Sequence, residues 1–443
     1  MIETVTRGIT WASNLVWGPW TIALLLGTGV FLTVRYRFVQ LRRFPEALRN
    51  LHPAGEAGAR GTLSPFQAFM TGLGASTGTG NIAGVATAIV TGGPGALFWI
   101  WCYGFFATVI KLTEAMLAVR FRTTSGERLL IGPMTYLATG LGSRRLARVY
   151  AAVAGVAALT TTPFTQPNSV AVVFESELGI PPWATGAAMM ILVFTVVIGG
   201  VKSIGRVASR LAPTMVTLYL LGGLVVIFAY ASRLPEVLAA VFGEAFSLGA
   251  AAGGATGVGV MVAMRYGIAR GIYANEAGYG TAAVAYGSAA SDRPAQQGLN
   301  AMVEVVIVSF VTSSVSALTI LLSGAWQSGA KSTAVVAAAF GSVIPSGNYL
   351  VLLCALLFGC STLIGWGYYG EQFLGYLAGP RIVLPYRLTY CALVLVGATT
   401  SVELVWSWGD LMNGLQIFPN IIGVLGLSGL VAKMLKDDEA RLS

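Results

Sequence analysis

The chain has 443 residues, of which 55% are hydrophobic and 10% are charged. A soluble domain carries about 25% charged residues, so this composition indicates a polytopic membrane protein with most of its length in the lipid bilayer. The formal net charge of +9 does not point to a nucleic-acid partner, because the Lys and Arg residues cluster in particular loops. Basic residues distributed in that way report membrane topology.

Charge-poor apolar runs predict an all-α fold with about eleven transmembrane helices. In chain order the runs are 17–34, 65–91, 95–119, 148–175, 183–200, 211–230, 257–286, 301–324, 349–369, 386–402 and 415–435. Two further apolar stretches, 234–246 and 333–344, are interpreted either as short helices along the outer interface or as loose loops.

The basic residues also predict the orientation. The loops after the first, third, fifth, ninth and eleventh runs are rich in Lys and Arg, whereas the alternate loops hold Arg233 and Lys331 as their main basic residues. Basic loops stay on the cytoplasmic side of a membrane. We therefore expect the N-terminus outside and the C-terminus in the cytoplasm, which agrees with an odd number of spans.

The cysteine, histidine and aspartate residues are not arranged as catalytic or metal-binding groups. Cys102, Cys354, Cys360 and Cys391 lie in apolar runs without metal-ligand spacing, so they are interpreted as packing residues. His52, the only histidine, lies in a basic loop. The spans show no catalytic His, paired Asp or metal-ligand set. We expect no enzymatic activity and no organic cofactor.

Residues 71–93, TGLGASTGTGNIAGVATAIVTGG, carry no charge and are numerous enough to cross a bilayer as a helix. Five glycines crowd the middle of this run, and each Gly inside a helix costs roughly 1 kcal/mol relative to Ala. Ser76, Thr77, Thr79 and Asn81 add polar groups at the same depth. Because unpaired backbone groups in lipid must be buried in protein or line a cavity, we predict a helix broken at mid-membrane beside a binding site.

A second interruption occurs in residues 265–282. Residues 81–88, NIAGVATA, match residues 275–282, NEAGYGTA, without gaps. The two segments lie five spans apart, and an odd offset places the second copy upside down in the membrane. The match predicts an inverted repeat with a site between two broken helices. The predicted division is a first helix with a basic segment (1–60), a first repeat (61–231), an outer loop (232–256), a second repeat (257–435) and a cytoplasmic tail (436–443).

A break of this kind suits a small zwitterion. The N-terminal end of a half-helix attracts a carboxylate, and the C-terminal carbonyls of the other half can coordinate a cation such as sodium. Ser361 and Thr362, in a later span, supply hydroxyls that either complete a sodium site or bond to their own helix.

Charged residues also lie within or beside the spans. Lys111 and Glu114 are three positions apart and are predicted to form an intramembrane ion pair. Glu276 is interpreted either as a proton or cation site or as the partner of Arg270. We favour the pair, because an unpaired charge in a membrane is costly.

Five segments in order, GTGNIAGVATA, GGPGALFWIW, TEAMLAVRFR, ANEAGYGTAAVA and GWGYYGEQ, resemble the alanine or glycine:cation symporter family of sodium-coupled amino-acid transporters. The resemblance extends from about Ser64 to Gln372. It implies a five-plus-five inverted repeat with two broken helices in a bacterial inner membrane. The segments PFTQPNS and IGPMTYL depart from the family pattern, which leaves the placement of the substrate against the fourth span open.

The resemblance also implies the site residues. The substrate would contact Thr79, Gly80, Asn81, Gln166, Gly271, Asn275 and Trp366. In this scheme the amides of the first break hold the substrate carboxylate, the backbone near the second break accepts the ammonium, and Trp366 limits the side-chain size. Sodium would be held by Gly74, Thr77, Ser361 and Thr362.

The expected function is the import of L-alanine, glycine or a similarly small neutral amino acid, with sodium as the coupling ion, by alternating access. Proton coupling is the first alternative, and Glu276 is the feature that recommends it. A channel is the second alternative, although a channel would favour rings of charge or a repeated carbonyl filter, and neither is visible. The sequence does not predict an oligomeric state.

Overall fold

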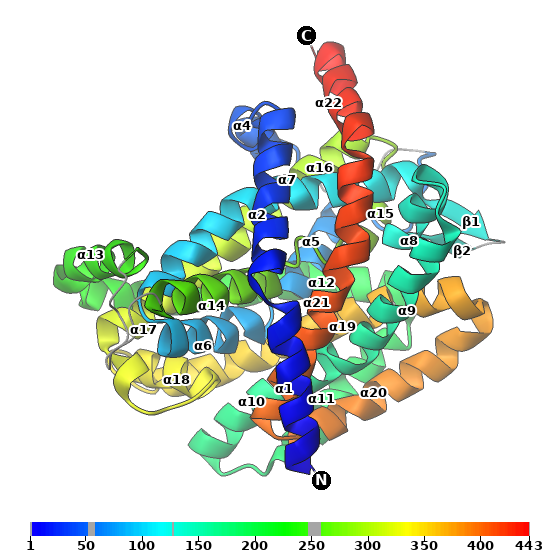
Figure 1. Ribbon diagram of the computed structural model, residues 1–443. Helices are drawn as coiled ribbons and strands as arrows, with labels where there is room; N and C mark the ends of the chain where they lie inside the picture. The colour runs from blue at the N-terminus through cyan, green and yellow to red at the C-terminus, as the bar shows by residue number, and fades with distance from the viewer. Residues whose placement is uncertain (1, 52–57, 126–127, 247–257, 443) are drawn as a thin grey trace.

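The structure is a computed structural model that describes residues 2–51, 58–125, 128–246 and 258–442. His52 and the 247–256 part of the predicted outer loop lie outside these residues. The described chain is almost entirely helical (Figure 1), apart from a short hairpin of β1 (Thr123–Ser125) and β2 (Arg128–Leu130). The two termini lie at opposite ends of the molecule.

Among the described residues, six helical segments are long and apolar enough to cross a bilayer. They comprise α1 (Ile2–Val16) continued by α2 (Pro19–Arg35), α7 (Gly95–Phe121), α12 (Gly200–Ala229), α16 (Pro294–Val306) continued by α17 (Ser313–Ser323), α19 (Gly347–Ala378) and α20 (Val383–Thr399). A further pair, α21 (Val402–Gly426) and α22 (Ser428–Leu442), is bent by 54°. The other predicted spans correspond to shorter or broken helices.

The remaining elements are short. The two predicted outer segments are helical, as α13 (Leu234–Glu244) and α18 (Thr333–Gly341). The other helices outside the breaks are α3 (Val39–Arg42), α4 (Phe44–Arg49), α8 (Pro133–Thr135) and α11 (Pro182–Val197). The predicted first span begins too late, because α1 already starts at Ile2 and packs along α21 (Figure 1).

The predicted fourth span is two helices, α9 (Arg144–Thr160) and α10 (Thr162–Leu178), that divide at Thr161. Two prolines account for the irregular backbone, since proline has no N–H to donate within a helix. Pro163 lies in the first turn of α10, and Pro167 lies inside it. Pro167 therefore cannot bond the carbonyl of Pro163, and Gly397 of α20 packs directly against that carbonyl.

We expect Gly397→Ala to lower the thermal stability of the purified protein. A Cβ at this position would lie 2.1 Å from the carbonyl oxygen of Pro163, and a backbone atom cannot easily move away. Overpacking of this kind typically costs about 1–3 kcal/mol. Gly243→Ala in α13 is the matched control, because an added Cβ there meets no atom within 4 Å. Equal melting temperatures for the two variants in detergent would contradict this packing.

The two predicted breaks are present. In the first, α5 (Pro65–Ser76) and α6 (Ala83–Gly92) flank the short turn η1 (Thr79–Asn81); in the second, α14 (Val258–Asn275) and α15 (Ala283–Gly287) flank residues 276–282. The half-helix before each break packs on the half-helix after the other, α14 on α6 and α15 on α5. This crossed pairing of half-helices is the arrangement expected of an inverted repeat.

The eight-residue match that indicated the repeat does not align equivalent positions. Asn81 lies within the first break, at the end of η1 and just before α6, whereas Asn275 is the last residue of α14 and precedes the second break. The two breaks and their packing therefore carry the evidence for the repeat. The matched residues reflect the similar composition of two interrupted helices.

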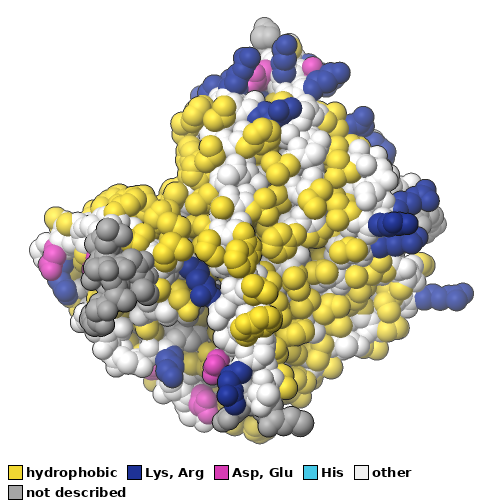
Figure 2. All heavy atoms as spheres, in the orientation of Figure 1, with side chains coloured by type: hydrophobic (Ala, Val, Ile, Leu, Met, Phe, Trp, Pro, Cys, Tyr) yellow, Lys and Arg dark blue, Asp and Glu magenta, His cyan; other side chains and the backbone are white. Residues whose placement is uncertain are grey.

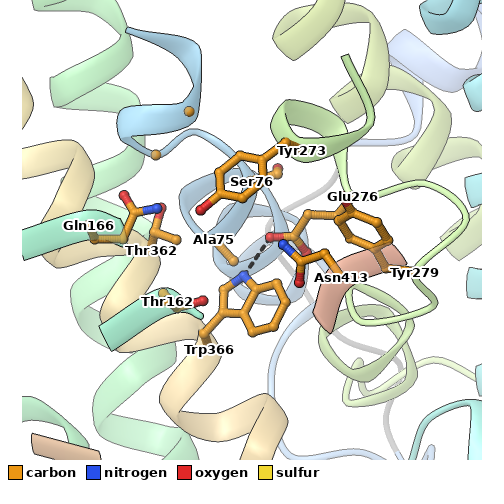
Figure 3. Close-up of a pocket in the computed structure, with 12 residues that line it drawn as sticks. Ala75, Ser76, Thr162, Gln166, Tyr273, Glu276, Tyr279, Thr362, Trp366 and Asn413 are labelled. Carbon is orange, nitrogen blue, oxygen red and sulfur yellow. Dashed lines mark hydrogen bonds between the residues drawn. The ribbon is translucent and has the colours of Figure 1, made fainter. Parts of the chain in front are cut away.

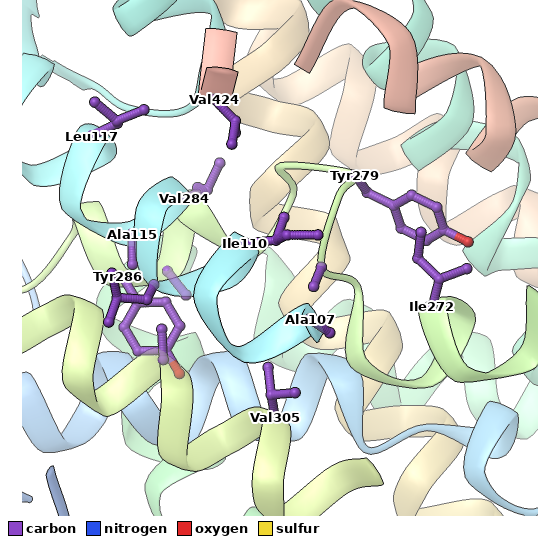
Figure 4. Close-up of a cluster of buried hydrophobic side chains, with 14 of the residues drawn as sticks. Ala107, Ile110, Ala115, Leu117, Ile272, Tyr279, Val284, Tyr286, Val305 and Val424 are labelled. Atoms are coloured by element: carbon purple, nitrogen blue, oxygen red, sulfur yellow. The ribbon is translucent and has the colours of Figure 1, made fainter. Parts of the chain in front are cut away.

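The half-helices α5, α14 and α15 are held in one apolar cluster (Figure 4), whereas α6 packs in a second one. Ile110 of α7, Ile272 of α14, Val284 of α15 and Val305 of α16 are all fully buried in one cluster. The outer surface is also apolar, with hydrophobic side chains covering much of the visible face (Figure 2). Soluble monomers rarely expose apolar patches of more than a few hundred Å². The chain is therefore an integral membrane protein.

Candidate functional site

A small cavity lies where the two breaks face one another (Figure 3). Its volume is about 10 Å³, which is about the room that one water molecule needs, so the cavity is almost closed and a ligand of few atoms would have to widen it. Its walls come from both breaks and from α5, α10, α14, α19 and α21. The lining residues are Ala75, Ser76, Gly78, Gly80, Thr162, Gln166, Tyr273, Glu276, Tyr279, Thr362, Trp366 and Asn413.

Gln166 joins α10 to the first break. Its Oε1 accepts hydrogen bonds from the backbone N–H and the hydroxyl of Thr79, both at 2.9 Å. Gly80 lets the ring of Tyr273 approach, because a Cβ there would lie 2.6 Å from the ring. The Tyr273 hydroxyl donates to Thr165 at 2.6 Å. Of the predicted residues, Gly80 and Gln166 therefore line one wall of the cavity, whereas Thr79 does not line it and is bonded to Gln166.

Asn81 stabilises the first break through hydrogen bonds on the side away from the cavity. Its Nδ2 donates to the carbonyl of Ser76 at 2.9 Å, across the interruption. Its Oδ1 and its carbonyl oxygen accept from the hydroxyls of Ser313 and Ser316, at 3.2 and 2.6 Å. Asn81 does not line the cavity, so the structure places it as a residue that fixes the shape of the break.

Glu276 is the acidic residue of the second break that lines the cavity. Its carboxylate accepts from the indole N–H of Trp366 at 2.6 Å and from the hydroxyl of Thr281 at 3.0 Å (Figure 3). Its φ of 58° is left-handed, a conformation that costs a non-glycine residue about 1–3 kcal/mol and often marks a functional position. This strained turn, together with Trp366, holds the carboxylate at the cavity wall.

The predicted pair between Arg270 and Glu276 is wrong. Arg270 bonds to Asp410 of α21, and its guanidinium lies over the Trp406 ring at 4.8 Å. Arg270 therefore reaches α21 and not the loop that follows its own helix. Glu276 is left as a carboxylate without a basic partner within 4.0 Å among the described residues.

The predicted pair between Lys111 and Glu114 is also wrong. The ammonium of Lys111 bonds to Glu304 and, at 2.6 Å, to the carbonyl of Asn275, the last residue of α14. Oε1 of Glu114 accepts from the backbone N–H of Gly278 at 2.9 Å. Exposed helix ends favour a cation at the carbonyls and an anion at the N–H groups. The two side chains therefore stabilise opposite parts of the second break instead of each other.

This arrangement also changes the predicted role of the second break. The carbonyl of Asn275 is taken by Lys111, and the Asn275 side chain bonds to Ser309 and to the N–H of Ala277 at 3.0 Å each. Neither Gly271 nor Asn275 lines the cavity. Glu276, the next residue after Asn275, is the charged group that this break presents to the cavity.

Three of the four predicted sodium-binding residues, Gly74, Ser361 and Thr362, lie together between α5 and α19. The hydroxyl of Thr362 donates to the carbonyl of Gly74 at 3.3 Å. Ser361 packs so closely that a Cβ on Gly74 would lie 2.5 Å from its hydroxyl. The hydroxyl of Thr77, at the end of α5, is buried without a hydrogen-bond partner among the described residues. Hydroxyls and the carbonyls of an unwound helix form the oxygen set that holds sodium in transporters.

The sodium:alanine symporter family matches the chain over residues 2–442. The chain belongs to this family. The sodium/alanine symporter AgcS of Methanococcus maripaludis is 37% identical over 96% of this chain and 95% of that protein. The probable sodium/glutamine symporter GlnT of Bacillus subtilis is 34% identical over 96% of this chain and 89% of that protein. The family is one of transporters, which confirms the resemblance seen in the sequence.

Solved structures of other transporters share the fold at low identity. MhsT in complex with L-phenylalanine superposes with a TM-score of 0.58 at 14% identity, over 85% of this chain and 100% of that chain. A Na⁺-coupled sialic acid symporter in its substrate-bound outward-open state gives a TM-score of 0.52 at 10% identity, over 91% and 87% of the two chains. These likenesses confirm the predicted fold class of this sodium:alanine symporter family member.

Several residues of the site were missed in the sequence. Tyr273 lines the cavity from α14, Tyr279 from within the second break and Asn413 from α21. Glu304, the partner of Lys111, is fully buried. A carboxylate in the apolar stretch of the eighth span is itself a signal of function or pairing, and it could have identified Glu304. Tyrosines carry no such signal, because they are common at helix ends.

Proposed function

We propose that this family member is a sodium-coupled symporter that carries alanine, glycine or a similarly small neutral amino acid into the cell by alternating access. One observation carries the proposal: a small cavity with polar groups in its walls lies between the two breaks. Beside it, the carbonyl of Gly74 in α5 lies against the hydroxyls of Ser361 and Thr362 in α19, which we call the α5–α19 oxygen cluster. In this proposal sodium is a transported ion, held by Gly74, Thr77, Ser361 and Thr362.

The substrate would lie in the cavity between the two breaks. Its carboxylate would face the first break at Thr79 and Gly80, with Gln166 beside it. Its ammonium would face the carboxylate of Glu276, because Lys111 already occupies the carbonyl of Asn275. Trp366 and the two tyrosines would limit the side chain, whereas Asn81, Gly271 and Asn275 would position the breaks.

We also propose a bacterial inner membrane with the N-terminus outside and the C-terminus in the cytoplasm. Dark-blue Lys and Arg side chains gather at the top of Figure 2, the end at which α22 terminates, and further ones lie along the right edge and in the lower part of the view. Membrane proteins retain such residues on the cytoplasmic side.

The test is uptake of labelled alanine into liposomes that hold the purified protein. We expect an inward sodium gradient to drive uptake and an inward proton gradient without sodium to fail. Unlabelled glycine should compete, and glutamine should compete poorly because the cavity is small. Uptake driven by protons alone, or stronger competition by glutamine than by glycine, would overturn the proposed coupling or substrate.

We expect Thr362→Ala and Ser361→Ala each to raise the sodium concentration for half-maximal uptake by about tenfold or more, corresponding to about 1.4 kcal/mol per factor of ten. Each change removes one hydroxyl oxygen from the proposed sodium site between α5 and α19. Neither change alters a charged residue of the cavity. Thr214→Ala, on the exposed face of α12, is the matched control. Unchanged sodium dependence in both site variants would place the ion elsewhere.

A further inference from the structure

A basic pocket lies between the end of α2 and the beginning of α22. It is lined by Arg35, Tyr36, Arg37, Arg42, Lys433, Lys436 and Glu439, among others. Arg42 pairs with Glu439 at 3.1 Å. The other four cations have no carboxylate within 4.0 Å among the described residues, and their side chains are exposed. The pocket therefore has a strong excess of positive charge.

An apolar groove runs along α2 beside α21. It is lined by Ala23, Leu24, Gly27, Thr28, Phe31 and Leu425. The groove is open at Gly27, where an added Cβ would meet no atom within 4 Å. Thr28 places a buried hydroxyl in its wall, and this hydroxyl has no hydrogen-bond partner among the described residues.

The groove and the pocket are adjacent parts of one surface. Phe31 lines the groove, Arg35 lines the pocket, and the guanidinium of Arg35 lies over the Phe31 ring at 5.5 Å. Arg35 also reaches α22, because a Cβ on Gly429 would lie 3.0 Å from its guanidinium. In Figure 2 a basic group at the top of the molecule lies directly above a wide band of hydrophobic side chains.

We propose that the pocket and the groove together bind one anionic phospholipid, with the phosphate in the pocket and an acyl chain in the groove. Arg and Lys bind phosphate through charge-assisted hydrogen bonds, and basic pockets between transmembrane helices bind anionic headgroups. Thr28 lies seven residues from Arg35, roughly 10 Å along a helix that rises 1.5 Å per residue. The groove thus lies within reach of an acyl chain attached to a phosphate in the pocket.

A phospholipid is the occupant that satisfies both parts of the surface. A soluble anion would use the cations and leave the groove empty, and a neutral lipid would use the groove and leave the cations without counter-charge. The bound lipid would hold α2, which lies outside the repeat, against α21. Because α21 contributes Asn413 to the cavity, the lipid would steady one wall of the transport site.

The test is native mass spectrometry of the full chain in detergent, titrated with dioleoyl phosphatidylglycerol or dioleoyl phosphatidylcholine. We expect one phosphatidylglycerol to bind at least tenfold more tightly than phosphatidylcholine. The variant R35Q/K433Q/K436Q should lose that preference. R144Q/R145Q/R148Q, which removes three exposed charges from α9, is the matched control and should keep it. K433Q/K436Q, with two exposed side chains, tests the same point if the triple variant does not fold.

The groove is tested by Gly27→Leu. The new side chain enters open space, so the protein should fold normally while phosphatidylglycerol binds at least fivefold more weakly; Gly27→Ala should bind as the native chain does. Equal binding of the two lipids, equal losses in both charge variants, or undiminished binding by Gly27→Leu would overturn the proposal. Equally tight binding of glycerol phosphate would show a site for a free anion instead of a lipid.

Discussion

Replacing Lys111 by Met is expected to abolish sodium-driven uptake and to lower the melting temperature of the purified protein. The substitution leaves the Glu304 carboxylate fully buried with hydroxyl partners alone, from Ser76 and Tyr286. It also leaves the carbonyl of Asn275 without its donor. Removing one member of a buried ion pair typically costs about 3–5 kcal/mol.

The transport defect has a structural cause beyond stability. Glu304 bonds to Ser76, the last residue of α5, and Lys111 bonds to the last residue of α14. The pair therefore links the interrupted ends of both broken helices. Without it, the two halves of the cavity are no longer fixed with respect to each other.

The double variant K111M/E304Q separates the two effects. Neutralising both members of a buried pair is often close to neutral for stability, so the double variant should regain most of the melting temperature lost in Lys111→Met. Lys202→Met, an exposed lysine on α12, controls for the loss of one charge. Near-native uptake by Lys111→Met, or a double variant as unstable as the single one, would contradict a role for the pair in joining the breaks.

The local features of the site are those that the sequence predicted well. The crowded glycines and hydroxyls of residues 71–93 identified the first break, and the adjacent Ser361 and Thr362 do lie against α5. Both predictions depend on composition within one segment. A side chain at position 74 would collide with Ser361 of α19. The close approach of α19 therefore requires glycine at this position, and a glycine can be recognised in the sequence.

The choice of polar partners could not be predicted in the same way. Lys111 pairs with a residue 193 positions away, and Glu276 bonds to Trp366, 90 positions away. Helical spacing favoured Glu114 for the lysine, but the free backbone groups of the second break compete for both side chains. Unsatisfied helix ends are created by the tertiary fold, so the partners that satisfy them are visible in the structure alone.

Glu276→Gln is expected to reduce alanine uptake about 100-fold or more while leaving the protein folded. Gln retains the size of the side chain and an oxygen that can accept from Trp366 at the observed 2.6 Å contact, so the break should keep its shape. The lost group is the negative charge at the cavity wall. Hydrogen bonds to a charged partner contribute about 1.5–3 kcal/mol each, and the substrate ammonium would lose such a bond along with its counter-charge.

Two measurements decide what the carboxylate does. If it holds the substrate ammonium, Glu276→Gln should require far more alanine for half-maximal uptake, and stabilisation of the purified variant by sodium should persist because α5 and α19 are unchanged. If it carries a proton, native uptake should follow a proton gradient and the variant should lose that response. Glu236→Gln, exposed on α13, is the control. If the variant needs no more alanine than the native protein for half-maximal uptake, Glu276 does not bind the substrate. The backbone carbonyl of Asn275 would then be the group that binds the substrate ammonium. Lys111, which bonds to this carbonyl, would have to leave it during the transport cycle.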